Sequence, residues 1–337
     1  MTSRSIMTMA AALLSLAIVI PHPAVADIVL YDALDFAPPA AKAFTKKTGI
    51  QVKLVEPGST GEVLGKIAAE GDNPQFDIVW LEGSAVLERM AESKVLRPIP
   101  NELIAKVAYT ELGKKLIPTS GAFLPTGAST TVITVNTKKV AADAMPKSWA
   151  DLGNPAFANA VAAKDPNLSG PAYQWLAGFF QTNGVDQGKV LLKNVLTNKA
   201  ISGLPSGGQV NKALLAGDAK VGIAQDSATF AKIAAGEPLA AIYPSEGSVA
   251  LPSAIGVSAK TKNWDQVAAF LEFVTSKEGQ MAMLDGNATD FFFIPIVDGV
   301  AAKPGRKTDI TFTYLDNPVA AAHETEWKKW YRENFVP

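Results

Sequence analysis

The alternation of short apolar runs with helical stretches constrains the fold of this chain more than any other feature. Predicted strands lie at residues 27–31, 50–55 and 76–81. Predicted helices follow them at residues 38–47, 62–69 and 84–93. Strands that alternate with helices indicate a parallel α/β sheet, in which ligands bind beyond the carboxyl ends of the strands. The segments after the strands are therefore expected to border one cleft: residues 31–35, 58–60 and 82–84.

The pattern changes near Phe123, where a second lobe is predicted to begin. A β-rich segment at residues 129–135 reads as a strand that crosses into this lobe, and residues 249–258 read as the returning strand. The segments predicted between them are helices at 171–182, 186–196 and 210–215 and a strand at 221–224. Helices are predicted after the returning strand, at 264–275, 278–284 and 320–331. The predicted domains are a discontinuous first lobe, residues 27–128 and 254–337, and a second lobe, residues 129–253.

The first 26 residues have the order of a secretory signal peptide. Arg4 precedes an apolar run at residues 9–20, two prolines follow, and Ala24-Val25-Ala26 supplies a small-x-small cleavage pattern. A membrane anchor is the alternative, but it needs about 18 or more apolar residues. We therefore predict export with cleavage after Ala26. The chain has no cysteine, so it cannot carry the lipid of a lipoprotein, and a free periplasmic protein is expected.

Composition excludes several classes of function. The chain has 31 Lys and Arg against 32 Asp and Glu and no basic stripe, which argues against a nucleic-acid partner. His22 falls in the leader, so His323 is the single histidine after it. Histidine-based acid–base chemistry or a zinc site would need partners that are missing. We therefore predict a binding protein without enzymatic activity, metal or cofactor.

Six short motifs occur along the chain in a characteristic order. They are Thr-Gly-Ile-Gln-Val at 48–52, Phe-Asp-Ile-Val-Trp at 76–80, Ser-Trp-Ala-Asp-Leu at 148–152, Asp-Pro-Asn-Leu-Ser-Gly at 165–170, Tyr-Pro-Ser-Glu-Gly-Ser at 243–248 and Ser-Lys-Glu-Gly-Gln at 276–280. Together they resemble type 2 periplasmic solute-binding proteins of ABC importers, in the branch that binds ferric iron, sugar phosphates and 2-aminoethylphosphonate. The resemblance implies a two-lobed fold with two crossing hinge strands. It also implies a monomer that closes on a small solute and docks on the importer's membrane permease subunits.

The same resemblance argues against iron as the solute. Ferric-iron members use an adjacent tyrosine pair just after a strand of the second lobe. That position reads Gln225-Asp226-Ser227-Ala228 here, so both phenolates are missing. The upstream histidine–glutamate ligands of that family would fall near residues 32–35, where this chain has no histidine.

Candidate anion-binding groups are serines at predicted helix starts near the cleft. Helix N-termini present unpaired N–H groups and a partial positive charge. The candidates are Ser59, Thr60, Ser84, Ser169, Gly170 and Ser206. Ser169-Gly170 matches the segment that holds a phosphate in the ferric relatives, although Pro171 removes one N–H. Simple helix capping is the alternative for each serine.

Candidate groups for a cationic end of the ligand are carboxylates and aromatic rings. The carboxylates Asp32, Glu82, Asp226 and Glu246 follow predicted strands or lie in turns, and they would hold an ammonium by charge-assisted hydrogen bonds. The rings of Tyr31, Trp80 and Tyr173 could cover a short spacer or contact the ammonium. Solvated loop positions and plain core packing are the alternatives.

The leading hypothesis is a small zwitterion such as 2-aminoethylphosphonate. Its phosphonate would lie on helix N-termini of both lobes and its amine on Asp226 or Glu246. Polyamines, sugar phosphates and ferric iron stay open as other cargoes. A periplasmic hydrolase with Ser206 as nucleophile is the alternative from another class, but the surrounding sequence is not a nucleophile elbow, and only His323 could assist it.

Overall fold

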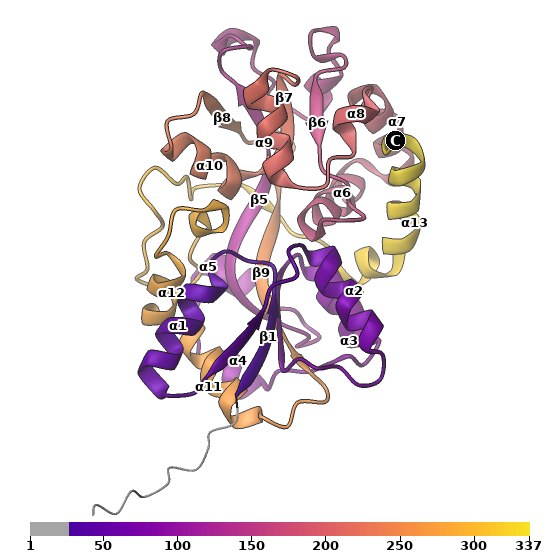
Figure 1. Ribbon diagram of the computed structural model, residues 1–337. Coiled ribbons are helices and arrows are strands. Elements are labelled where there is room, and N and C mark those ends of the chain that lie inside the picture. Colours follow the sequence, from indigo (N-terminus) through magenta and orange to yellow (C-terminus); the bar gives the residue numbers. More distant parts are fainter. Residues whose placement is uncertain (1–26) are drawn as a thin grey trace, which may run out of the picture.

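The structure is a computed structural model that describes residues 27–337, so the predicted leader lies outside the described residues. It is a mixed α/β fold of two lobes, with lobe 2 above lobe 1 in Figure 1. The strands are β1 (Ile28–Asp32), β2 (Val52–Val55), β3 (Ile78–Glu82), β4 (Leu96–Arg97), β5 (Leu124–Asn136), β6 (Val161–Ala163), β7 (Val221–Gln225), β8 (Leu239–Ile242), β9 (Ser248–Ser258) and β10 (Phe312–Thr313). Within the described part they join in one sheet of order β2-β1-β3-β9-β5-β7-β6, with β4, β8 and β10 attached at its sides.

Lobe 1 is built on β2, β1 and β3, which run parallel and are covered on both faces. The helices around them are α1 (Ala37–Thr48), α2 (Thr60–Glu70), α3 (Ser84–Glu92), α4 (Asn101–Ala105), α5 (Glu111–Lys115), α11 (Trp264–Val274) and α12 (Lys277–Met283). Successive strand side chains alternate between two cores, because a strand has a period of two. Ile78 and Trp80 of β3 pack in the core with α1 and α11, whereas Val79 and Leu81 pack in the core with α2 and α3.

Lobe 2 is built on β6 and β7, which are parallel, and on the antiparallel strands beside them. Its helices are α6 (Gly170–Asn183), α7 (Val185–Val195), α8 (Lys199–Ser202), α9 (Gly207–Ala216) and α10 (Asp226–Ala234). Four short 3-10 turns lie in the described chain: Ala142–Ala144, Ala150–Gly153 and Pro155–Phe157 in this lobe, and Thr289–Phe292 beyond it. The core again has two parts, since Ile223 packs with α6 and α7 and Ala224 packs with α9.

Two long antiparallel strands connect the lobes. The first part of β5 pairs with β9, from Leu124 opposite Ile255 to Thr130 opposite Ala250. From Thr131 onward β5 pairs with β7 instead, so one continuous strand belongs to both half-sheets. These are the crossing strands that the sequence predicted, although β5 begins earlier than expected.

The C-terminal helix α13 (Asn317–Phe335) runs along the side of lobe 2, from just above α3 to the level of α7 and α8 (Figure 1). Its buried side chains Trp327, Tyr331 and Phe335 belong to the core formed by α6 and α7. The sequence prediction placed this part of the chain in lobe 1. The exact lobe boundaries stay a prediction, but the apolar face of α13 packs on lobe 2. No described helix is long and apolar enough to cross a membrane.

Candidate functional site

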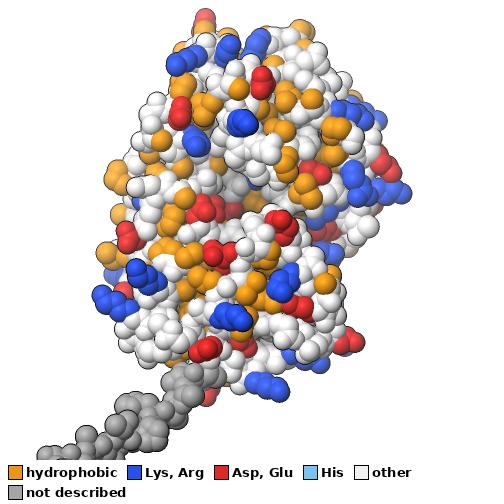
Figure 2. All heavy atoms as spheres, viewed as in Figure 1, with side chains coloured by type: hydrophobic (Ala, Val, Ile, Leu, Met, Phe, Trp, Pro, Cys, Tyr) orange, Lys and Arg blue, Asp and Glu red, His pale blue; other side chains and the backbone are white. Residues whose placement is uncertain are grey.

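A cleft of about 170 Å³ lies between the two lobes. The space-filling view shows a hollow at this level, with acidic side chains at its edges (Figure 2). Lobe 1 contributes Ala33, Leu34, Gly58, Ser59, Thr60 and Glu82; lobe 2 contributes Lys164, Leu168, Ser169, Pro171, Pro205, Ser206, Gly207 and Gln225; and Asp290 completes the lining. The segments after β1, β2 and β3 therefore meet at one cleft, as the parallel sheet requires.

Three helices begin at this cleft, and each has a serine at its N-cap. The Ser59 hydroxyl accepts from the Glu62 N–H at the start of α2, at 3.3 Å. Ser169 and Ser206 cap α6 and α9 in the same way. These serines are therefore helix caps and also candidate ligand contacts, because the helices that they cap begin at the cleft. Free N–H groups at helix starts favour an anion there.

The two lobes touch at the N-terminus of α6. A Cβ atom on Gly170 would lie 2.7 Å from the Glu82 carbonyl oxygen and 3.1 Å from Thr60 Cγ2, both in lobe 1. Gly170 itself lies just behind the cleft lining. Only a residue without a side chain allows this approach, which indicates that the structure is the closed form.

A hydrogen-bonded chain links the lobes at the floor of the cleft. Lys164 Nζ donates to Gln225 Oε1 at 2.7 Å, and Gln225 Nε2 donates to a carboxylate oxygen of Glu82. The other Glu82 oxygen accepts from Ser129 at 3.1 Å. The amide of Gln225 thus presents its oxygen to Lys164 and its NH₂ group to Glu82. The cleft floor therefore has a basic side chain on lobe 2 and an acidic side chain on lobe 1.

Burial shifts the ionisation of these groups. Removal from water raises the pKa of Glu82 and lowers the pKa of Lys164, because both charged forms lose hydration. Burial raises the pKa of Asp290 as well, and the nearby Asp35 carboxylate adds to that shift. Asp290 Oδ2 accepts from the Asp35 N–H at 2.9 Å, which fixes its position at the rim. Titratable groups with shifted pKa values in a cleft are typical of a functional site.

Asp32 lies beneath the cleft and is not among its lining side chains, although the next two residues are. Its carboxylate is buried and accepts from the Leu34 N–H at 3.2 Å, while Oδ2 has no partner among the described residues. Burial, assisted by the charges of Glu56 and Asp290, raises the Asp32 pKa to about 7.

Asp226 does not reach the cleft, contrary to the sequence prediction. It is fully buried and forms an ion pair with Arg306 Nη2 at 2.5 Å. It also accepts from the Thr130 N–H and from the Tyr243 hydroxyl. Because its charge is already neutralised, no ligand amine is needed there.

Glu246 is also placed away from the cleft. One of its oxygens accepts from the Trp149 N–H at 2.9 Å, and the other accepts from the Ser245 hydroxyl. It therefore fixes a turn of lobe 2, which was the structural alternative for this residue.

The three aromatic candidates are core side chains. Tyr31 packs on Phe76, and its hydroxyl donates to Glu70. Trp80 is fully buried, and its indole N–H donates to Thr126 at 2.9 Å. Tyr173 is buried in the core with α13, and its hydroxyl donates to the Ala320 carbonyl oxygen. A period-two strand places alternate side chains inward, so aromatic residues that end strands are easily mistaken for ligand contacts.

Ser84 begins α3 but faces a different part of the molecule. Its N–H and hydroxyl both contact Gln174 Oε1 at 3.2 Å, and its hydroxyl also contacts Asn317. It lies near a second surface pocket and not in the cleft. Gly83, which precedes Ser84 as the N-cap of α3, has a φ of 104° that favours glycine.

Sequence reasoning missed Lys164, Gln225 and Asp290 as side chains of the site. Lys164 follows β6, a strand of only three residues that has no clear sequence pattern. Gln225 was noted only as the place of a missing tyrosine. Asp290 lies in a stretch for which no element was predicted. A lysine directly after a short apolar run and before Asp-Pro is the signal that could have revealed Lys164.

Two lobes joined by two crossing strands, with a polar cleft between them, define a solute-binding protein of the periplasmic type. The family model for bacterial extracellular solute-binding proteins matches residues 39–313, and the chain belongs to this family. Members of this family are solute-binding proteins, and the match supports the role of solute-binding component of an ABC importer.

Curated relatives and solved structures agree with this assignment. The Fe(3+)-binding periplasmic protein of Serratia marcescens is 26% identical over 294 residues, covering 85% of this chain and 82% of the relative. An uncharacterised Haemophilus influenzae protein is 28% identical, covering 71% and 69%. Iron-bound HitA from Pseudomonas aeruginosa superposes with a TM-score of 0.78 at 23% identity, covering 92% of this chain and 99% of HitA. AfuA from Actinobacillus pleuropneumoniae, with fructose-6-phosphate bound, gives 0.79 at 20%, covering 92% and 98%. These structural likenesses show the two-lobed fold.

Proposed function

We propose that this protein captures a small phosphonate-bearing zwitterion, such as 2-aminoethylphosphonate, in the cleft between its lobes. The observation that carries the proposal is the convergence of three helix N-termini from both lobes on one cleft that also contains a lysine and two carboxylates. An anionic group and a cationic group at opposite ends of a small solute match this arrangement.

The anionic end is assigned to the starts of α2, α6 and α9 and to Lys164. Helix N-termini bind phosphate-like groups through backbone N–H donors and the helix dipole. The buried ammonium of Lys164 adds a point charge on the same lobe as α6 and α9. None of the described residues that line the cleft is an arginine, so the group bound here is expected to be compact.

The cationic end is assigned to Glu82 and Asp290. The sequence had favoured Asp226 and Glu246 for this role, but both carboxylates are bound to other groups of the protein. A ligand ammonium at this end would keep both carboxylates ionised, since a nearby cation lowers the pKa of a carboxyl group. The ligand would therefore add a second counter-charge to that of Lys164, which already lowers the pKa of both carboxylates.

Several relatives are named as ferric iron-binding proteins, which makes iron the main competing cargo. Ferric iron prefers hard, anionic oxygen donors. The described residues that line the cleft include two carboxylates and no tyrosine, and they include a lysine, whose charge repels a metal cation. The same lysine disfavours a polyamine. A sugar phosphate would share the anion end but would leave the carboxylates without a cation.

The proposal includes the steps before and after capture. The leader would be removed after Ala26, and the protein would work as a free periplasmic monomer. Closure of the lobes would bury the solute, and the closed form would deliver it to the membrane permease subunits.

A panel of ligands tests the proposal. Residues 27–337 would be titrated by calorimetry and by thermal shift with 2-aminoethylphosphonate, ethylphosphonate, putrescine, glucose 6-phosphate and ferric citrate. A ligand at 100 times its dissociation constant stabilises the protein by about 2.7 kcal/mol. We expect the largest shift with 2-aminoethylphosphonate. A shift with ferric citrate or putrescine and none with the aminophosphonate would refute the proposal.

Matched variants then test which end of the ligand is held where. Asp290→Asn should weaken 2-aminoethylphosphonate at least tenfold and leave ethylphosphonate nearly unchanged, because only the former has an amine. Lys164→Met should weaken both. Glu246→Gln is the control, since this residue lies away from the cleft. Equal loss of both phosphonates in Asp290→Asn would contradict the assigned orientation.

A further inference from the structure

A second pocket, of about 350 Å³, lies outside the ligand cleft. It is larger than the cleft, which has about 170 Å³, and the two share no lining residue among those described. Its walls are the first turns of α3, the segment 115–119 after α5, part of β9, Gln174 of α6 and the segment 314–318 at the start of α13. Its volume lies in the range of sites that hold small organic molecules.

One wall of this second pocket carries a buried carboxylate that has no counter-ion. Glu88 of α3 is only 6% exposed, and its Oε1 atom accepts from the Ser120 hydroxyl at 2.9 Å. Among the described residues, no lysine or arginine forms an ion pair with it. Burial raises the pKa of the Glu88 carboxyl group, and the hydrogen bond from Ser120 offsets part of this shift. A cation that enters the pocket would therefore find an uncompensated negative charge.

The polar side chains one turn before Glu88 are hydrogen-bonded to one another. Gln174 Nε2 donates to the Ser84 hydroxyl at 3.1 Å and to the Ala250 carbonyl oxygen at 3.0 Å. The Ser84 hydroxyl in turn contacts Asn317 Oδ1. Because these neutral groups satisfy one another, the charge of a ligand would be matched by Glu88 and not by this wall.

The two other charged side chains of the lining have contacts of their own. Lys115 is exposed, and its Nζ atom lies over the Tyr314 ring, 5.5 Å from the centroid. Asp316 Oδ1 accepts from the Val319 N–H at the start of α13, at 3.1 Å. Much of the remaining lining is apolar and includes Leu116, Ile117, Pro252 and Leu315. A ligand with an apolar body and one cationic group matches this combination.

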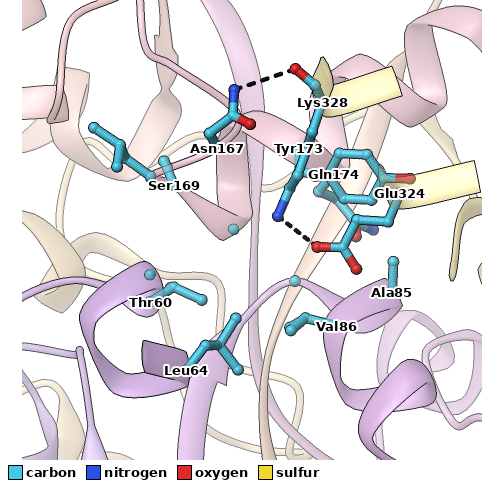
Figure 3. A pocket seen from close by; sticks show the side chains of 14 residues that line it. Thr60, Leu64, Ala85, Val86, Asn167, Ser169, Tyr173, Gln174, Glu324 and Lys328 are labelled. Carbon is cyan, nitrogen blue, oxygen red and sulfur yellow. Dashed lines mark hydrogen bonds and ion pairs between the residues drawn. The ribbon is translucent and has the colours of Figure 1, made fainter. Parts of the chain in front are cut away.

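A smaller cavity nearby shows what distinguishes this pocket. It has about 20 Å³, enough for about one water molecule, and lies between α2 and α3 on one side and α6 and α13 on the other (Figure 3). Gln174 lines both spaces. The buried carboxylate of the smaller cavity, Glu324, is bonded to Lys328 (Figure 3). The larger pocket differs in both respects, since it has room for an organic molecule and its buried carboxylate lacks a cation.

We propose that this pocket is a second binding site, for a small organic amine with an apolar body and a single positive charge. The ammonium group would donate to Glu88, and the body would contact the segment 116–118. Glu88, its partner Ser120 and this segment all belong to lobe 1, so these contacts do not depend on the angle between the lobes. The site is also independent of the solute proposed for the cleft.

Three compounds with the same ring test the proposal: benzylamine, benzyl alcohol and benzoate. Each would be titrated into residues 27–337 labelled at the isoleucine δ1 methyl groups and followed by NMR. Ile117→Val identifies the signal of Ile117, which lines the pocket. We expect benzylamine to shift this signal saturably and benzyl alcohol to bind at least tenfold more weakly, because it forms no charge-assisted hydrogen bond. The proposal is overturned if benzylamine leaves the Ile117 signal unchanged, or if benzoate binds as well as benzylamine.

A matched pair of variants on α3 then tests the role of the carboxylate. Glu88→Gln removes the charge but keeps an oxygen that can accept from Ser120. It should weaken benzylamine at least tenfold and leave benzyl alcohol nearly unchanged. Glu92→Gln is the control, since it makes the same change one turn further along α3, at an exposed position outside the lining. Thermal unfolding verifies that both variants are folded, and equal weakening of benzylamine in both would contradict the assignment to Glu88.

A variant of the cleft separates this inference from the proposed function. Asp290→Asn changes a carboxylate that lines the cleft and not the second pocket. The affinity for benzylamine should therefore stay the same in Asp290→Asn. A loss as large as that in Glu88→Gln would place the amine in the cleft and overturn the second site. If 2-aminoethylphosphonate does not bind to the protein at all, the benzylamine titrations still decide on the second site alone.

Discussion

At the scale of single residues, the buried charges of lobe 2 depend on partners that are distant in the sequence. Asp226 is separated from Arg306 by 80 positions, yet their side chains form an ion pair that is closed to solvent. Arg306 also donates to the Phe292 carbonyl oxygen at 2.7 Å and lies over the Phe230 ring. Such a pair adds little net stability by itself, but removal of one partner leaves an uncompensated buried charge.

Asp226→Ala is therefore expected to reduce the free energy of unfolding by about 3–5 kcal/mol. Arg306→Met should have a similar cost, because it leaves the Asp226 carboxylate buried and unpaired. Urea denaturation measures both. Glu246→Ala, at a half-buried turn, is the control and should cost much less. A stable Asp226→Ala protein that has lost only its affinity for an amine-bearing ligand would restore the role that the sequence suggested.

Asp32 makes stability depend on pH. Its pKa is raised from 3.8 to about 7 by burial, so the folded protein favours the neutral carboxyl form. The unfolded chain ionises near pH 4 and the folded one near pH 7, so stability is lost as the pH rises through this window. A shift of this size corresponds to a few kcal/mol.

Asp32→Asn should remove that dependence. An amide can still accept from the Leu34 N–H, and it has no charge to bury. The variant should be more stable than the parent at pH 8 and nearly equal to it at pH 4, measured by urea denaturation across the window. A constant difference between the two proteins at all pH values would contradict the raised pKa.

At the scale of elements, local patterns predicted most of the helices and strands of the sheet. Apolar runs bounded by glycine and polar residues predicted β1, β3 and β7 within one or two residues, because burial on both faces requires such runs. Helix α10 was missed, because its start at Asp226 was interpreted as a ligand loop. The 286–313 segment was also missed. Its Phe293 and Ile296 pack in the lobe 1 core, and its Arg306 pairs with Asp226, so its position depends on distant contacts and not on local periodicity.

The candidate site was less predictable than the fold. The serine caps of α2, α6 and α9 have a local signature, so Ser59, Ser169 and Ser206 were found at the cleft. The direction of a strand-end side chain has no such signature, and Trp80 was therefore assigned to the ligand although its indole is in the core. Capping is encoded within four residues, whereas the face on which a side chain lies depends on the whole sheet.

The close approach at the start of α6 gives a prediction for one helix. Gly170→Ala places a methyl group 2.7 Å from the Glu82 carbonyl oxygen, so the lobes cannot close fully. We expect ligand affinity to fall at least tenfold, and small-angle scattering of the ligand-saturated protein to show a larger radius of gyration.

The same substitution at Gly65, in the middle of α2, is the matched control. A Cβ atom there meets nothing within 4 Å. Gly65→Ala should stabilise the protein by about 0.5–1 kcal/mol, because alanine loses less backbone entropy in a helix. If both variants leave scattering and affinity unchanged, the approach at Gly170 is not needed for closure.

At the scale of the whole molecule, the chain returns to lobe 1 through β9 and then comes back to lobe 2 for its last helix. The C-terminal residues 317–335 share a core with α6 and α7. Chain order alone suggested that these residues belong to lobe 1, because β9 returns the chain to lobe 1 before they begin. Most core residues of each lobe pack within that lobe, although Ala85 of α3 packs in the core of α6, α7 and α13. A defect in the core of one lobe should therefore first open that lobe.

Two core truncations test this division. Trp327→Ala and Phe270→Ala each remove a buried aromatic side chain, with an expected cost of about 3–5 kcal/mol. Because Trp327 packs with α6, its removal should reduce hydrogen-exchange protection in α6 and α7 more than in α1 and α11. Phe270 packs in the lobe 1 core, and its removal should give the reverse pattern. Equal loss of protection in both lobes from either variant would show that the lobes unfold as one unit and that α13 does not belong to lobe 2 alone.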